Sequence, residues 1–171
     1  MSAIKQAQTT RATRYLEARD RGLAFLVRQL RPDGGFGAVE RGVTDYYKVI
    51  SVLNVCGETL LANRLCKWIR ENGMTPEGDF VPRPADAFQY SHAYYNSWVI
   101  GGAHRVGQYD LSMRGFDFLM GFYDPESGGF YSSPTERSES TLQDIWVVCG
   151  AGRAALAVGQ IQVAEGVGRW L

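Results

Sequence analysis

Residues 118–131 read FLMGFYDPESGGFY, and this stretch decides the fold because the chain carries two related versions of it. Phe118 closes an amphipathic pattern, and a turn rich in Asp, Pro and Gly then leads to a second aromatic residue, Phe130. The same order appears in residues 25–36, which contain PDGGF, and in residues 68–80, which contain PEGDF. The two aromatic residues are separated by 11, 12 and 12 positions in the three copies. Recurrence at a fixed spacing indicates an internal structural repeat.

A second recurring feature defines the rest of the unit. Three thirteen-residue segments begin with glycine and end with an aromatic residue followed by Ile or Leu: GETLLANRLCKWI at 57–69, GQYDLSMRGFDFL at 107–119 and GQIQVAEGVGRWL at 159–171. Their glycines are spaced by 50 and 52 residues. An apolar helical segment precedes each glycine, which ends that helix at low conformational cost. A second helix with a 3.6-residue period follows.

The repeating unit is therefore a helical hairpin followed by a long structured turn. The first helices, which contain VISVLNV, WVIGGA and IWVVCGAGRAALAV, are more apolar than the second. This difference predicts an inner row of buried helices and an outer row of amphipathic ones. No segment shows the alternation that a strand requires. We expect one all-α domain spanning residues 1–171, with repeats at roughly 22–56, 57–106, 107–158 and 159–171.

Composition restricts the possible function. The chain has 18 basic and 18 acidic residues among 171, scattered along its length, which argues against a nucleic-acid or anionic-membrane partner. The longest apolar runs are too short for a membrane span, and the N-terminus has no apolar signal core. Three cysteines without ligand spacing favour small buried side chains over a metal site. We expect a cytoplasmic protein with no metal and no cofactor.

The two clearest copies of the turn, together with the period of about 50 residues, resemble the prenyltransferase and squalene-cyclase repeat superfamily. These copies are FLVRQLRPDGGFG at 25–37 and FLMGFYDPESGGFY. The resemblance extends over most of the chain from Gly22 onward and implies an α/α toroid, a barrel of helical hairpins. N-acylglucosamine epimerases and unsaturated-glucuronyl hydrolases share a similar barrel, so the resemblance does not select a reaction. The DxDD and DDxxD motifs of terpene cyclases are absent, and nothing supplies the zinc ligands of protein prenyltransferases.

Chain length departs from this family pattern. A closed toroid of twelve helices needs roughly twice this chain. Three explanations follow: a truncated chain, a partial toroid completed by a second chain, or a short open variant. We expect a partial barrel that is incomplete at the C-terminus, and a homo-oligomer that covers the open edge is the alternative.

Polar and aromatic residues gather twelve to fifteen positions before each repeat glycine, as in SHAYYNSWVIGG at 91–102. These positions begin the inner helices, whose N-termini would converge on one mouth of a toroid and would favour negative charge. We expect four side chains there to perform acid–base chemistry: His92, Asp45, Asp144 and Tyr95. The alternative is purely structural, with the two aspartates as helix caps or first-turn acids and the histidine as a satisfied helix-start residue.

A second group of side chains is expected to bind the substrate, because they carry aromatic rings or hydrogen-bonding groups near the same mouth. This group comprises Tyr46, Tyr47, Tyr94, Asn96, Trp98, Trp146 and Arg83. Aromatic walls bind flat, apolar or sugar-like ligands, although such stripes also occur in cores. Arg83 belongs to the loop DFVPRPADAFQYS at 79–91, which is placed as a rim or lid would be. Glycines inside the inner helices, including Gly101 and Gly102, indicate close packing or, alternatively, room for a ligand.

These observations favour an enzyme that performs metal-free acid–base chemistry, namely a cyclisation, isomerisation or lyase step, on a largely apolar small molecule. A sugar epimerase or glycoside-processing enzyme is the first alternative. The second is a half-toroid that binds a ligand or a partner without catalysis. The toroid fold by itself does not decide among them.

Overall fold

The computed structural model describes residues 3–84 and 91–171, and in this part of the chain the regular structure is helical, with isolated β-bridges but no strand. The all-α prediction is confirmed. Within the described chain, no helix combines the length and the apolar character needed to cross a bilayer. Residues 85–90 of the loop that carries Arg83 lie outside the described residues.

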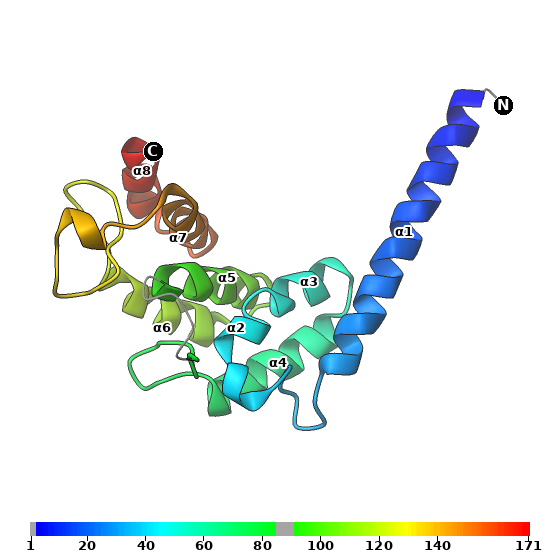
Figure 1. The fold of residues 1–171 in the computed structure, drawn as a ribbon, viewed down its shortest axis with the longest axis horizontal. Coiled ribbons are helices and arrows are strands. Elements are labelled where there is room, and N and C mark those ends of the chain that lie inside the picture. The colour runs from blue at the N-terminus through cyan, green and yellow to red at the C-terminus, as the bar shows by residue number, and fades with distance from the viewer. Residues whose placement is uncertain (1–2, 85–90) are drawn as a thin grey trace.

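Six helices form three consecutive hairpins. Their bounds are α3 Val49–Val55 and α4 Thr59–Asn72, α5 Ser91–Arg105 and α6 Tyr109–Met120, and α7 Ile145–Ala157 and α8 Ile161–Trp170. Short helices precede the first and third hairpins: η1 Val39–Arg41, α2 Val43–Tyr46 and η2 Glu139–Thr141. Helix α5 packs against both α3 and α7, and each of these three also packs against the second helix of its own hairpin. The first helices thus make one continuous row (Figure 1).

Each hairpin bends at the repeat glycine. Gly57, Gly107 and Gly159 have φ values of 86°, 77° and 79°, the left-handed region that glycine enters without a steric penalty. Each glycine amide donates to a carbonyl in the last turn of the preceding helix, so the glycine caps that helix. The same residue type, conformation and hydrogen bond therefore recur at all three bends.

The turns that follow α1, α4 and α6 are also alike. An isolated antiparallel bridge closes each of them, between Leu30 and Phe36, Met74 and Phe80, and Tyr123 and Phe130. The closing aromatic side chains are all buried in the hydrophobic core. Each turn therefore fixes the end of one hairpin to the core instead of acting as a loose connection.

A glycine in each turn lies against the outer helix of the next hairpin. A Cβ atom on Gly34 would lie 3.2 Å from the carbonyl oxygen of Arg64 in α4, and one on Gly78 would lie 2.4 Å from that of Arg114 in α6. Gly128 makes the corresponding approach to Gly166 in α8. All three have positive φ, so both backbone conformation and close approach require glycine there. These contacts fix each turn against the second helix of the hairpin that follows it.

Helix α1, Ala3–Gln29, has two different parts. Its C-terminal end packs on the core through Leu23 and Leu26, and Leu30 continues this contact just beyond the helix. Residues 10–22 are exposed, and Figure 1 shows that the N-terminal half extends away from the hairpins. Tyr15 and Leu16 are exposed apolar side chains on this half.

Candidate functional site

Asp79 occupies a position where the other two turns carry glycine. The second turn reads GDF at 78–80, whereas the first and third read GGF. A Cβ on Gly35 or Gly129 would lie 2.9 or 2.8 Å from an indole atom of Trp68 or Trp170. The equivalent aromatic residue of the second turn is Phe118, whose smaller ring leaves space for a side chain. This departure from the repeat is the sequence signal for Asp79, which was not among the predicted site residues.

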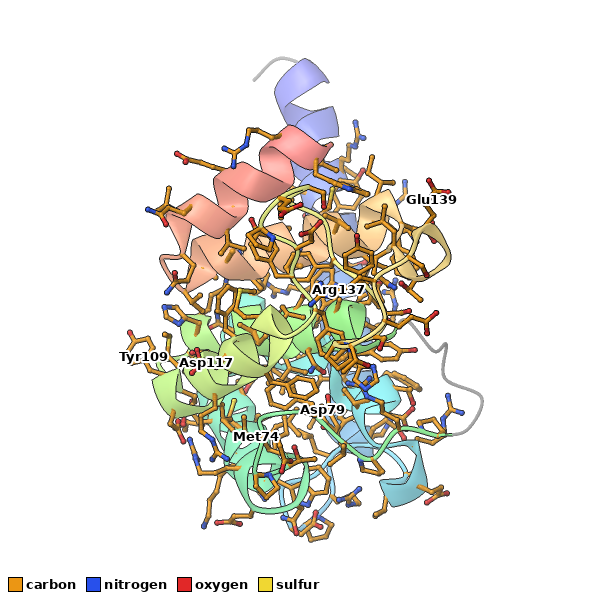
Figure 2. All side chains as sticks on the ribbon, turned by 90° about the vertical axis from the view of Figure 1, so that its left-hand side faces the viewer. Met74, Asp79, Tyr109, Asp117, Arg137 and Glu139 are labelled. Atoms are coloured by element: carbon orange, nitrogen blue, oxygen red, sulfur yellow. The ribbon has the colours of Figure 1, made fainter. Side chains whose placement is uncertain are left out.

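The Asp79 carboxylate is held by several donors. Its Oδ1 atom accepts hydrogen bonds from Arg83 Nη2 at 2.6 Å and from Asn96 Nδ2 at 2.9 Å. The Phe80 amide also donates to Oδ1, and His92 Nε2 lies 3.5 Å from Oδ2. We call the four side chains of Asp79, Arg83, His92 and Asn96 the Asp79 cluster. Figure 2 shows Asp79 near the middle of the molecule, and its side chain is only 13% exposed.

Hydrogen bonds also connect the other members of the Asp79 cluster. Arg83 Nη2 donates to the Asn96 side-chain oxygen at 2.7 Å, and Asn96 is completely buried. A buried carboxylate and guanidinium stay charged only where good geometry and further hydrogen bonds compensate for lost hydration. The cluster meets that condition, so it rigidly connects the second turn to the first turns of α5.

His92 presents one edge to Asp79 and one face to aromatic rings. Its ring stacks on Phe122 with centroids 5.4 Å apart and lies 6.2 Å from Phe118. The imidazole lines an open groove whose other walls include Glu77 and Pro134, and it is 30% exposed. The carboxylate orients the ring as it would orient a general acid or base, but Nε2 faces Asp79 and Nδ1 is buried, so the exposed part of the ring is its carbon edge.

A set of aromatic side chains forms a connected layer along the row of first helices. We call it the aromatic wall, and it comprises Tyr47, Tyr94, Tyr95, Trp98 and Trp146. Tyr47 contacts Tyr95 with ring centroids 4.8 Å apart, and Tyr94 contacts Trp146 at 4.3 Å, both edge to face. Tyr94 and Tyr95 are themselves 5.6 Å apart. Each side chain of the wall is only partly buried, so its surface is accessible to a ligand.

Two cations lie against Trp98 of the aromatic wall. Lys48 Nζ is 5.0 Å from the ring centroid, and Arg153 Cζ is 4.4 Å from it. Lys48 also lies 5.0 Å from the Tyr47 ring and 5.5 Å from the Tyr94 ring. Hydrogen bonding to the Tyr94 hydroxyl, and secondarily to Tyr47, raises the pKa of Lys48 against the opposing effect of desolvation. The ammonium group is thus kept protonated among the rings.

The Asp79 cluster and the aromatic wall meet at Tyr95. The Arg83 guanidinium lies 5.9 Å from the Tyr95 ring centroid. Tyr95 follows His92 by three residues on α5, a spacing that places the two side chains on neighbouring positions of one helix face. The predicted residues His92, Tyr95, Asn96 and Arg83 are therefore brought together with most of the predicted aromatic side chains.

The two predicted aspartates lie elsewhere. Asp45 accepts a hydrogen bond from the Ala38 amide at 3.3 Å and pairs with Arg41 at 3.5 Å, so it stabilises the segment before α2. Asp144 is the exposed N-cap residue of α7, and its side chain makes no capping hydrogen bond. Among the described residues, Asp45, His92 and Asp144 are not within hydrogen-bond or ion-pair distance of one another. The expected convergence of the three is not observed, because each engages its own local surroundings.

Tyr46 also differs from the prediction. Instead of lining a pocket it is completely buried, and its hydroxyl lies 2.9 Å from the Val81 carbonyl oxygen and 3.1 Å from that of Gly73. Its ring makes an edge contact with Trp68. Burial raises the pKa of the Tyr46 hydroxyl far above its ordinary value. Tyr46 is a core residue that fixes the second turn.

The described residues contain no group of three or more His, Cys, Asp or Glu side chains arranged to hold a metal ion. Comparisons with protein-family models, with curated proteins and with solved structures find no match to this chain.

Proposed function

We propose that this chain contributes three hairpins to an α/α toroid enzyme of the kind that its repeat resembles. The enzyme would perform a metal-free proton transfer, as in a cyclisation, isomerisation or lyase step, on a largely apolar small molecule. The continuous row of α3, α5 and α7 and the recurring glycine geometry support the toroid. A row of this kind forms the inner wall when hairpins close into a ring.

The observation that carries the proposed reaction is the contact between His92 and Asp79 beside the aromatic wall. His92 is assigned the proton transfer because it is the most exposed member of the Asp79 cluster, and the transfer requires the ring to turn, since Nδ1 is buried and Nε2 faces Asp79. Asp79 is a positioning residue, since its carboxylate lies 3.5 Å from His92 Nε2 and orients the imidazole. Arg83 and Asn96 in turn hold the carboxylate in place.

The aromatic wall supplies the binding surface for the body of the substrate. Tyr94, Tyr95 and Trp146 offer ring edges and faces next to the Asp79 cluster. Trp98 is different, because Lys48 and Arg153 already lie against it and would repel a carbocation. The geometry therefore favours isomerisation or elimination over a cyclisation whose cation passes Trp98.

The test uses the two histidines of the chain, which lie near opposite ends of α5. His104 contacts the Ser112 hydroxyl at 3.0 Å, outside the Asp79 cluster, and provides the matched control. Wild type, His92→Gln and His104→Gln are incubated with a panel of apolar and ring-containing small molecules, and products are followed by mass spectrometry. We expect turnover by wild type and by His104→Gln, and a loss of at least about 100-fold in His92→Gln. Equal turnover by both variants would contradict the assignment.

A second candidate function is ligand binding without catalysis. It is favoured by one observation: both Asp79 oxygens already face protein donors, and the other predicted acids, Asp45 and Asp144, lie away from His92. In that case the same panel would show ligands that bind the aromatic wall, detected by tryptophan fluorescence, and that remain chemically unchanged.

A further inference from the structure

A small groove between α3, α5 and α7 lies next to the aromatic wall. The residues that define its chemistry are Ser51, Ser97, Trp98, Gly101, Arg105 and Arg153. The groove is partly open to solvent, and its inner space of about 20 Å³ holds roughly one water-sized group. The groove is separate from the one that His92 lines, so it is available to hold a different part of a ligand.

The groove is lined by positive charge without a compensating acid. Arg105 and Arg153 both border it, and Lys48 lies against the ring of Trp98, one of its lining residues. In the described part of the chain, no carboxylate lies within ion-pair distance of any of the three. Contact with Trp98 keeps the Arg153 guanidinium in a defined place. Several cations converging on a concave surface attract an anion.

Gly101 shows that the space in this groove is not used for packing. A Cβ atom at Gly101 would find no atom of another element within 4 Å, although the residue lies inside α5. Its neighbour Gly102 is different, because a Cβ there would lie 3.0 Å from Ile50 Cβ and 3.0 Å from Ser51 Oγ. Alanine is a better helix former than glycine, so open space at Gly101 is maintained against the preference of the helix. The alternative of room for a ligand therefore applies to Gly101, and the close-packing explanation applies to Gly102.

We propose that the groove binds the carboxylate group of a small organic acid whose body lies along the aromatic wall. The inference rests on the proposed function in one respect: it specifies the charged group of that enzyme's substrate. Guanidinium groups offer paired N–H donors that match the two oxygens of a carboxylate. The Ser51 hydroxyl borders the same space as a further polar group. The inner space admits one carboxylate oxygen, with the rest of the group at the open side, and is too small for a diphosphate.

The test measures binding with probes that differ only in charge or in the anionic group. Wild-type protein is titrated at low salt with 3-phenylpropionate, with the neutral 3-phenylpropionamide and with phenyl phosphate, and tryptophan fluorescence and protein NMR shifts are followed. We expect the acid to bind at least about tenfold more tightly than the amide, and to bind more weakly as salt is added. Arg153→Gln should weaken acid binding about tenfold, and Gly101→Leu should abolish it by filling the groove.

Arg28→Gln provides the control for charge, because Arg28 is an exposed arginine on α1 and should leave binding unchanged. Thermal unfolding and circular dichroism of Gly101→Leu, compared with wild type, provide the control for folding. The inference is overturned if the amide binds as well as the acid or if Arg153→Gln matches wild type. It is also overturned if phenyl phosphate binds more tightly than the carboxylate, or if no acid binding is detected up to about 10 mM.

Failure of this inference and failure of the proposed function are distinguishable. Selective binding of the acid without turnover of any acid would support the carboxylate site and would refute the proposed catalytic function. Turnover that depends on His92 but is unaffected by Arg153→Gln and Gly101→Leu would support the enzyme and refute the carboxylate site.

Discussion

The Asn96 side-chain amide donates a hydrogen bond of 2.9 Å to Asp79 Oδ1, which joins the second repeat turn to the inner helix α5. The same oxygen accepts a hydrogen bond from Arg83, and the neighbouring oxygen faces His92. Because Asn96 is fully buried and Asp79 nearly so, the bond fixes the turn relative to the helix. The candidate acid–base residue is consequently oriented by structure that continues into the core.

Replacing Asp79 with asparagine should destabilise the protein. The substitution preserves shape but removes the carboxylate charge that lies 2.6 Å from the mostly buried Arg83 guanidinium. We expect the free energy of unfolding, measured by urea denaturation, to fall by about 2 kcal/mol. Asp117→Asn is the matched control, since Asp117 is an exposed carboxylate on α6 (Figure 2). Equal stability of the two variants would show that the Asp79 cluster is not a structural tie.

Adjacent glycines of α5 should respond in opposite directions to alanine. Gly101→Ala should raise the free energy of unfolding by up to about 1 kcal/mol, because the new methyl group enters open space. Gly102→Ala should lower it by about 1–2 kcal/mol, because its Cβ would press on Ile50 and Ser51. Thermal unfolding of both variants checks this, and a loss of stability in Gly101→Ala would contradict the open groove.

The ion pair between α4 and α6 should make stability depend on acid pH. Hydrogen bonds from Arg70 lower the pKa of Asp110 below its ordinary value of 3.8. A carboxyl group whose pKa is lower in the folded state stabilises the fold above its unfolded pKa. This contribution is lost as pH falls through the lower, folded value. Since Asp110 is about half exposed, we expect less than about 1 kcal/mol.

The measurement compares wild type with Asp110→Asn by urea denaturation from pH 6 to pH 2. The difference in unfolding free energy should be constant at the upper end and disappear at the lower end. Glu71→Gln is the control, because its contact with Lys67 is a looser 3.9 Å pair between exposed side chains. A wild-type advantage over Asp110→Asn that persists unchanged at pH 2 would disprove the coupling.

Cys66 should react with a thiol reagent more slowly than the other two cysteines. Cys66 is completely buried, and burial raises the pKa of its thiol to about 12 from 9.0. In the folded state Cys66 therefore stays a protonated, unreactive thiol. Its contribution to the free energy of unfolding is fully present below about pH 9 and is lost as pH rises toward 12. At pH 8, iodoacetamide should modify the partly exposed Cys56 and Cys149 first. Peptide mass spectrometry that finds Cys66 modified equally fast in the native protein would contradict this packing.

The sequence predicted the helical hairpins because their determinants are local. Glycines such as Gly57 and Gly107 must adopt left-handed backbone at the end of a helix, and the apolar periods on either side are visible without a structure. The side chains on α5 from His92 to Trp98 were also predicted to act near one another, since one helix carries them all. Such features depend on residues close in sequence.

The remaining parts of the site depend on contacts between distant segments. Asp79 is accommodated where Phe118, about forty positions later, replaces a larger indole, a relationship that periodicity does not reveal. Tyr46 was predicted to line a pocket, but the Gly73 and Val81 carbonyl groups of the second turn draw its hydroxyl into the core. Asp45, His92 and Asp144 were all predicted to begin inner helices, but Asp45 lies in the separate short helix α2 and Asp144 is the N-cap residue of α7, so each has its own local surroundings.

The most direct test of the central claim is solvent-proton transfer by His92. A substrate found in the panel is converted in D₂O by wild type, by His92→Gln and by His104→Gln, and the product masses are compared. The account predicts product from wild type and His104→Gln, with one solvent deuterium in it if the reaction is an isomerisation and none if it is an elimination, and product formation at least about 100-fold slower in His92→Gln. Product that forms at an undiminished rate in His92→Gln would contradict it.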